Sequence, residues 1–516
     1  MLPTPSVLES AAAALNSQPG TITQRLLGFF DTGLFRFAAF VALTPILLRG
    51  LGEAQFGMIG VAAALTGYLS IAQRGVQEET TRLCAAALRA GDAERAREAL
   101  ASALVLLGGL GVIAGGALAV TSVEIAQLFG ADADLLPACS LFLALQAAKM
   151  LLLQPISAYT AAGEAGGRLA QLQAMRGMGT LLQVAAAFGA IGWNLGLPGL
   201  AALDLAGTAV VVLSARRAGL AALRDPKSQS SPGITVRSAR RATIAQLAAA
   251  GVLLGANGPG LLAAFDAGLL VVAAVLGLHA VAPFAIAVHG CRLLIGSGLY
   301  LAGGLYPTFA TLALHGERLQ MRWVFRRAMD ATLLTASGLS LLVIAFGRPV
   351  MAVWLDLKLP PWTATALGLC VLTAAPVVVA GRYVARAGLE TVVLGVTALE
   401  CAVAVGLSLW LIGEYGIAGV AIGVAAAQVL TSFWLLPHVG CRHLRIVPAR
   451  FWFARYWRTA VVIAPAIAST GMFALARPPN TSRDLVVQIG IAVILHSVAA
   501  FAAWYLLETR PEMDAE

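Results

Sequence analysis

The sequence predicts an all-α integral membrane protein with about 14 transmembrane helices, arranged as two parallel six-helix repeats followed by two C-terminal helices. Three observations lead to this fold class: the composition, a series of long apolar runs, and an internal repeat. The chain has 516 residues, of which 59% are hydrophobic and 12% charged, and its mean hydropathy is +0.83. Soluble domains carry about 25% charged residues, so the composition excludes that class.

Polar breaks divide the chain into fourteen apolar runs, most of them near the roughly 20 residues that a helix needs to cross the hydrocarbon core. The predicted spans are 28–49, 55–73, 99–121, 136–158, 170–192, 199–215, 244–276, 280–304, 328–347, 362–381, 390–412, 416–437, 459–476 and 485–507. The seventh contains GANGPG at residues 255–260. We expect a bend there, because glycine and proline interrupt helical hydrogen bonding.

Basic residues are concentrated in alternate connections between these spans. Counted from a cytoplasmic N-terminus, the cytoplasmic connections hold most of the arginines, with clusters in residues 74–97, 216–241, 318–327 and 442–458. The opposite connections hold only Arg49, Arg348, Lys358, Arg477 and Arg483. Positively charged connections remain in the cytoplasm, so the asymmetry predicts that both termini lie inside and that the number of spans is even. This bias accounts for most of the net charge of +9 without nucleic-acid binding.

Short motifs recur at a nearly constant distance along the chain. Three pairs of glycines share one offset (Gly52 with Gly277, Gly91 with Gly316, Gly163 with Gly388), and two pairs share a slightly shorter one (Gly196 with Gly416, Gly199 with Gly419). The first twelve spans therefore form two six-helix halves. Because six is even, both halves enter from the same side, and a binding site is expected between them near the membrane midplane.

The predicted division of the chain follows from these spans. It comprises a cytoplasmic N-terminal segment (1–24), a first lobe (25–215), a cytoplasmic linker (216–243), a second lobe (244–440), a cytoplasmic loop (441–458), two extra helices (459–507) and a cytoplasmic tail (508–516). The N-terminal segment lacks the charged and apolar regions of a secretory signal peptide. The six cysteines are scattered without metal-ligand spacing, so we expect packing roles and no metal site.

Seven charged residues fall inside the predicted spans: Arg36, Lys149, Arg176, Asp204, Asp266, Arg292 and Glu400. Exposure of all seven to lipid would cost on the order of 20 kcal/mol, more than the net stability of a fold, so they must face protein or water. Helical spacing supports a polar cavity. The fifth span carries one polar stripe, formed by Gln173, Arg176, Thr180 and Gln183. Three other spans carry polar pairs, namely Gln146 with Lys149, His289 with Arg292, and Asp204 with Thr208.

Cations outnumber acids among the buried charges of the first half. Arg36, Lys149 and Arg176 face only Asp204 there, and Arg292 lies in the second half. Guanidinium and ammonium groups suit phosphate or pyrophosphate, so these four cations are candidate substrate-binding residues. Asp266 and Glu400 are candidates for H⁺ or Na⁺ coupling, and no other cofactor is expected.

Structural roles for the same charges remain open at this level. Arg36, Lys149 and Arg292 could each form an ion pair with Asp266, Asp204 or Glu400. Arg176 could extend to the membrane interface, and His289 could be a core histidine.

Segments of both halves, within residues 43–94 and 265–317, resemble the polysaccharide flippases, a family within the superfamily of multidrug, oligosaccharidyl-lipid and polysaccharide exporters. LTPILLRGLGEAQFGMIG (residues 43–60) carries the LGxxx[FY]G turn of the first repeat and is followed by AGDAE near residue 92; FDAGLLVVAAVLGLHAVAPFAIA (265–287) and YPTFATLALHGE (306–317) resemble the second repeat. His315 and Glu317 depart from the usual Gly-Asp there. The resemblance covers residues 25–440.

The resemblance implies two lobes in a V-shaped arrangement that alternate access. It implies a non-enzymatic flippase of the bacterial inner membrane that moves undecaprenyl-pyrophosphate-linked oligosaccharide, with lipids as further partners and room for contacts with other polysaccharide assembly proteins. Basic residues of the first, fourth and eighth spans are implied to bind the pyrophosphate, and the matching positions are Arg36, Lys149 and Arg292.

Three other functions compete with this interpretation. An ion-coupled multidrug or small-molecule exporter of the same superfamily predicts acids in the first-half cavity, where the sequence has mostly cations. A membrane polysaccharide polymerase or ligase requires a catalytic loop outside the membrane, and no long connection lies on that side. A sugar transporter of the major facilitator type usually carries a D-R-x-G-R-R loop, which is absent.

Overall fold

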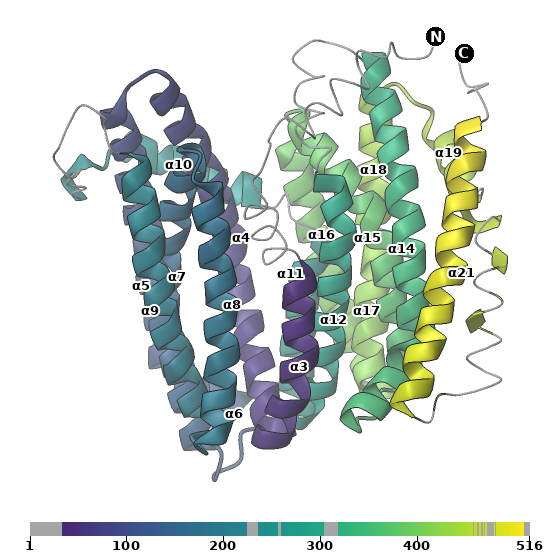
Figure 1. Ribbon diagram of the computed structural model, residues 1–516, viewed down its shortest axis with the longest axis horizontal. Coiled ribbons are helices and arrows are strands. Elements are labelled where there is room, and N and C mark those ends of the chain that lie inside the picture. Colours follow the sequence, from purple (N-terminus) through teal and green to yellow (C-terminus); the bar gives the residue numbers. More distant parts are fainter. Residues whose placement is uncertain are drawn as a thin grey trace.

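The computed structural model describes residues 33–223, 236–255, 260–303, 318–457 and 481–509, with short pieces between 459 and 479. The described chain is helical, and eleven of its helices are long and apolar enough to cross a membrane. Figure 1 shows two groups of helices side by side with α3 (Gly33–Leu51) between them. The predicted all-α membrane architecture is confirmed.

The first lobe contains five long helices besides α3 and one short helix. These are α4 (Glu53–Arg89), α5 (Ala93–Val120), α6 (Ser122–Leu128), α7 (Leu136–Ala165), α8 (Leu169–Gly192) and α9 (Gly196–Ala222). The first six predicted spans each overlap one helix of this group or α3. Helix α7 packs against α5 and α9, and α8 packs against α9 and α3, so α7, α8 and α9 form one wall of the molecule.

The second lobe contains α11 (Gly260–Leu276), α12 (Leu278–Gly303), α14 (Arg318–Leu355), α15 (Pro361–Arg386), α16 (Glu390–Tyr415), α17 (Ile417–Leu430) and α18 (Ser432–His443). The predicted seventh span, 244–276, is two helices, α10 (Arg241–Gly255) and α11. The GANGPG bend was expected between them, and its residues 256–259 lie outside the described part of the chain. The predicted twelfth span is divided at Thr431 into α17 and α18.

The packing of α10 differs from the expected grouping. It was assigned to the second lobe (244–440), but it packs mainly against α4 and α5. Polar contacts hold it there: Gln246 donates to Glu79 Oε1 at 2.7 Å and Thr243 donates to Glu98 Oε1 at 2.8 Å. A boundary placed from hydropathy alone misses this, because such contacts join residues far apart in the sequence.

The segment expected as a cytoplasmic loop, 441–458, is largely helical. Helix α18 continues to His443, and α19 (Pro448–Trp452) and the π-helical turn η2 (Phe453–Trp457) follow. An ion pair between Arg455 and the buried Asp330 of α14 ties η2 to the second lobe. The last helix, α21 (Ser482–Thr509), packs against α14, whereas most of the predicted span 459–476 lies outside the described residues.

Glycines in the turns between helices support the internal repeat. Gly52 and Gly277 both have positive φ, at 80° and 78°, directly before α4 and α12. Gly196, the first residue of α9, and Gly416, directly before α17, have φ of 63° and 55°. These conformations are costly for residues with a Cβ. One predicted pairing is wrong: the counterpart of Gly388, with φ of 79° after α15, is Gly167, with φ of 72° after α7, and not the helical Gly163.

The two lobes meet closely at the end where α4 and α12 begin. A Cβ at Gly57 would lie 2.1 Å from the carbonyl oxygen of Leu278, and one at Gly60 would lie 2.9 Å from the Cβ of Ala285. Only glycine allows this approach of α4 to α12. The largest cluster of buried apolar residues joins both lobes here, so this end of the molecule is closed.

Replacing Gly57 by alanine should separate the lobes at this end, because the Leu278 backbone cannot move aside. We expect a cysteine introduced at Ile59, in a chain lacking the six native cysteines, to react several-fold faster with a membrane-impermeant maleimide. Gly108→Ala is the matched control, since no atom lies within 4 Å of a Cβ at that position. Equal labelling in the two variants would show that the α4–α12 contact does not close this end.

Candidate functional site

A cavity of about 880 Å³ lies between the two lobes. Its lining comes from seven helices: α3, α4, α7, α8 and α9 on one side and α11 and α12 on the other. Five charged side chains line it, namely Arg36, Lys149, Arg176, Asp204 and Arg292. Four of these are cations and one is an acid, so the cavity is lined by positive charge.

Helical spacing brings the polar side chains to the cavity in pairs, as predicted. Gln146 with Lys149 come from α7, Thr180 with Gln183 from α8, Asp204 with Thr208 from α9, and His289 with Arg292 from α12. Residues three or four positions apart share one face of a helix. Gln173 is the exception, because it belongs to the predicted stripe of α8 but does not line the cavity.

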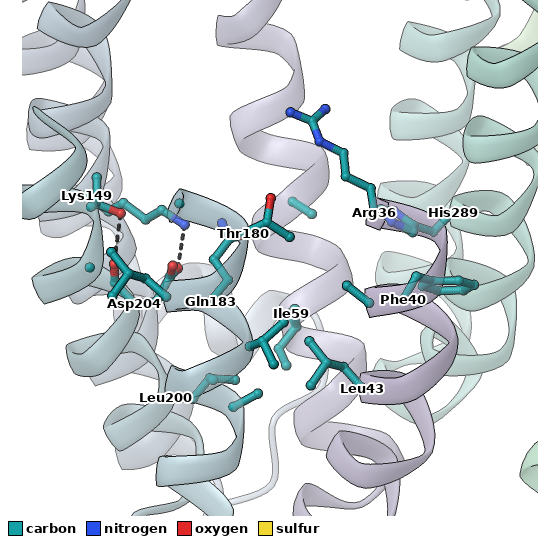
Figure 2. Close-up of a pocket in the computed structure, with 18 of the residues that line it drawn as sticks. Arg36, Phe40, Leu43, Ile59, Lys149, Thr180, Gln183, Leu200, Asp204 and His289 are labelled. Atoms are coloured by element: carbon teal, nitrogen blue, oxygen red, sulfur yellow. Dashed lines mark hydrogen bonds and ion pairs between the residues drawn. The ribbon is translucent and has the colours of Figure 1, made fainter. Parts of the chain in front are cut away.

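Ion pairs neutralise three of the four cavity cations. Lys149 pairs with Asp204 between α7 and α9 (Figure 2). Arg292 Nη2 lies 2.5 Å from Asp266 Oδ1 and also donates to the carbonyl oxygen of Leu262 at 3.1 Å. The structural alternative therefore holds for both residues, although each still lines the cavity.

Arg176 is neutralised by an acid that the sequence interpretation missed. Its Nη2 lies 3.0 Å from Glu164 Oε1, and Gln77 and Thr81 of α4 also donate to this carboxylate, at 3.4 and 3.5 Å. Glu164 lies beyond the predicted fourth span, 136–158, whereas α7 continues to Ala165. The expectation that the first-half cations face only Asp204 was wrong for this reason.

Arg36 differs from the other three cations. It lies exposed on α3, and within the residues that the structure describes it forms no ion pair. Figure 2 shows its side chain extending from α3 into the cavity near His289, whose ring centroid lies 4.9 Å from that of Phe40. The exposed His289 is thus a cavity residue and not a core histidine.

The cavity has a polar zone and an apolar zone. The closed end is lined by apolar side chains from α3, α4 and α9, among them Leu43, Ile59 and Leu200. Figure 2 places these below the level of Arg36, Lys149 and Thr180. A ligand bound here would therefore place its polar groups in the middle of the cavity, away from the closed end.

The two predicted coupling acids lie outside the cavity lining. Asp266 is 4% exposed and lies against α4, where a Cβ at Gly67 would be 2.4 Å from its Oδ2. Glu400 of α16 is fully buried beside Gly260 and forms no ion pair with any described residue. Among the described residues no group of three or more His, Cys, Asp or Glu could hold a metal ion, and all six cysteines are free thiols.

The fold is similar to those of solved multidrug transporters and of a lipid II flippase. The lipid II flippase MurJ in an inward closed conformation superposes with a TM-score of 0.68 at 11% identity, over 94% of this chain and 100% of that chain. An inward-facing multidrug resistance MATE family transporter gives a TM-score of 0.65 at 15% identity, over 79% of this chain and 94% of that chain.

The eukaryotic MATE transporter AtDTX14 gives a TM-score of 0.55 at 13% identity, over 80% of this chain and 98% of that chain. No protein-family model matches the sequence, and no curated protein sequence matches it. At these identities the likeness concerns the fold, and the substrate has to be argued from the cavity.

Proposed function

We propose that the protein is a flippase that moves undecaprenyl-pyrophosphate-linked oligosaccharide from the cytoplasmic to the periplasmic leaflet of a bacterial inner membrane. It acts by alternating access and serves the synthesis of surface or exopolysaccharide. The observation that carries the proposal is Arg36, a cation without a counter-ion among the described residues, in a cavity between two lobes. A pyrophosphate would supply the missing negative charge. Likeness in fold to a lipid II flippase supports the proposal.

The size of the cavity limits what it holds. Its volume of about 880 Å³ is typical of small-molecule sites, which span roughly 300–1,000 Å³. The pyrophosphate and the first sugars fit such a space, whereas the polyprenyl chain stays in the lipid. In the proposed orientation, with the arginine-rich connections in the cytoplasm, the closed α4–α12 end faces the periplasm and the structure is the loading state.

The test is to deplete the protein in its host and locate the lipid-linked oligosaccharides of the inner membrane. The proposal expects them to accumulate in the cytoplasmic leaflet, protected from a periplasmic glycosidase, while surface polysaccharide disappears. Unchanged lipid-linked sugars together with sensitivity to cationic drugs would contradict it and would identify a drug exporter.

An ion-coupled exporter of small molecules is the second candidate. It is favoured by the likeness in fold to MATE transporters and by Glu400, a buried acid without a cation partner among the described residues. Asp266 already has Arg292 as its counter-ion, so Glu400 is the better candidate for a coupling site. Coupling by H⁺ or Na⁺ is compatible with either substrate.

Replacing Glu400 by glutamine should abolish any dependence of transport on an imposed H⁺ or Na⁺ gradient, because the amide neither titrates nor balances a bound cation. Transport by purified protein in proteoliposomes, measured with and without each gradient, checks this. The control is Glu414→Gln, an exposed acid on the same helix. Retained gradient dependence in the Glu400 variant would assign Glu400 a structural role.

A further inference from the structure

Three adjacent helices of the first lobe, α7, α8 and α9, contribute nine polar or charged side chains to the cavity lining. We call six of them the first-lobe wall: Gln146, Lys149, Thr180, Gln183, Asp204 and Thr208. Figure 2 shows Lys149, Asp204, Thr180 and Gln183 at similar height on one side of the cavity, with Arg36 on the other. Two of these six residues come from each of α7, α8 and α9.

This wall has no net charge. Lys149 and Asp204 pair with each other, and the remaining four side chains are two amides and two hydroxyls. Arg176, on the same side, is balanced by Glu164. The unbalanced cation Arg36 belongs to α3 and lies opposite. The anionic group of a ligand is therefore drawn to the α3 side, and an electrically neutral group faces the first-lobe wall.

The wall retains unused hydrogen-bonding capacity. The amides of Gln146 and Gln183 make no hydrogen bond within the described residues, and Lys149 uses one of its three donors on Asp204 Oδ2. Thr180 and Thr208 donate to carbonyl oxygens of their own helices, at 3.3 and 2.8 Å, which leaves their oxygens free to accept. The surface of the three helices therefore offers both donors and acceptors.

A neutral surface that offers both donors and acceptors fits a polyhydroxylated group, since each hydroxyl both donates and accepts. A phosphate group accepts hydrogen bonds but does not donate them when ionised, and the carboxylate of Asp204 would repel it. An apolar ligand would leave the two amides unsatisfied. Of these three chemistries, the wall is suited to a sugar.

We propose that the first-lobe wall is a subsite for the uncharged sugar that adjoins the pyrophosphate, with Gln146 and Gln183 as specificity-determining residues. The proposal rests on the proposed function and assigns the two parts of the head group to opposite sides of one cavity. Arg36 binds the charge that all such substrates share. The first-lobe wall distinguishes substrates that carry a sugar from those that do not.

The test compares two soluble probes on the purified full-length protein: farnesyl diphosphate, and farnesyl diphosphate carrying one N-acetylhexosamine. Wild-type protein should bind the glycosylated probe about tenfold more tightly, the gain from one or two neutral hydrogen bonds. The Gln146→Leu/Gln183→Leu variant should bind both probes equally. Arg36→Gln should weaken both by the same factor and leave their ratio unchanged.

Gln173→Leu is the matched control, because Gln173 lies on α8 but outside the cavity lining. The ratio of the two probe affinities should be the same in this variant as in the wild type. Gln183→Asn keeps an amide at this position and should still prefer the glycosylated probe. That result would show that the leucine variant loses its preference because the amides are gone and not because the protein misfolds. An unchanged ratio in the double leucine variant, or equal binding of both probes by the wild type, would overturn the subsite and leave the flippase intact. Failure of the wild type to bind either probe would instead overturn the proposed function.

Discussion

Replacing Arg36 by glutamine should lower transport of the lipid-linked substrate roughly 10- to 100-fold, the equivalent of losing one charge-assisted hydrogen bond of about 1.5–3 kcal/mol. The protein should remain folded and inserted, because Arg36 is exposed on α3 and has no ion-pair partner among the described residues that would be left uncompensated. Transport per inserted molecule, measured in vesicles with fluorescently labelled lipid-linked oligosaccharide, is the readout.

Two further variants test whether the shape of the cationic group and its place in the cavity matter. Arg36→Lys keeps the charge but loses the planar fork that can bind two phosphate oxygens, so we expect an intermediate rate. Arg49→Gln removes an exposed arginine from the same helix outside the cavity lining and should not change the rate. A transport rate of the Arg36→Gln variant equal to that of the wild type would show that this cation does not bind the substrate.

Replacing Lys149 by methionine should destabilise the protein by about 3 kcal/mol, because it leaves the mostly buried carboxylate of Asp204 without its cation. Both side chains are mostly buried, 17% and 16% exposed. Asp204→Asn should cost a similar amount by stranding the ammonium group. The Lys149→Met/Asp204→Asn variant should return close to wild-type stability, since neither charge remains unpaired.

The measurement is the unfolding midpoint in detergent for all four proteins of this double-mutant cycle. A favourable coupling energy shows that the pair is a unit, as the structure indicates. Strictly additive losses would mean that Lys149 and Asp204 do not stabilise one another, and Lys149 would then become a direct candidate for binding the anion.

The helices and the polar faces of the cavity follow from local sequence. Apolar runs of membrane-spanning length and their polar breaks located most of the helices, because each span must satisfy its own backbone in lipid. The three- and four-residue spacing of polar side chains placed Lys149, Asp204 and Arg292 on cavity-facing surfaces, because residues so spaced share one face of a helix. The residues where these predictions failed, such as Glu164 and Gln173, lie at helix ends.

Which charges are balanced depends on how the helices pack, and only the tertiary structure decided it. Lys149 and Asp204 are 55 residues apart and meet because α7 packs on α9. Arg292 meets Asp266 because α12 lies beside α11. From the sequence alone Arg36, Lys149 and Arg292 were equivalent cations.

The sequence by itself therefore determined the membrane class, most of the spans, the repeat and the polar stripes, since these depend on composition and on spacing within one helix. Contacts between distant segments decided three further features. They group α10 with the first lobe, pair three of the cavity cations with acids, and leave Arg36 without an ion pair among the described residues. Coulomb energy acts over a few ångströms in space whatever the separation along the chain, and for that reason only the packed helices could show which cation is left for a ligand.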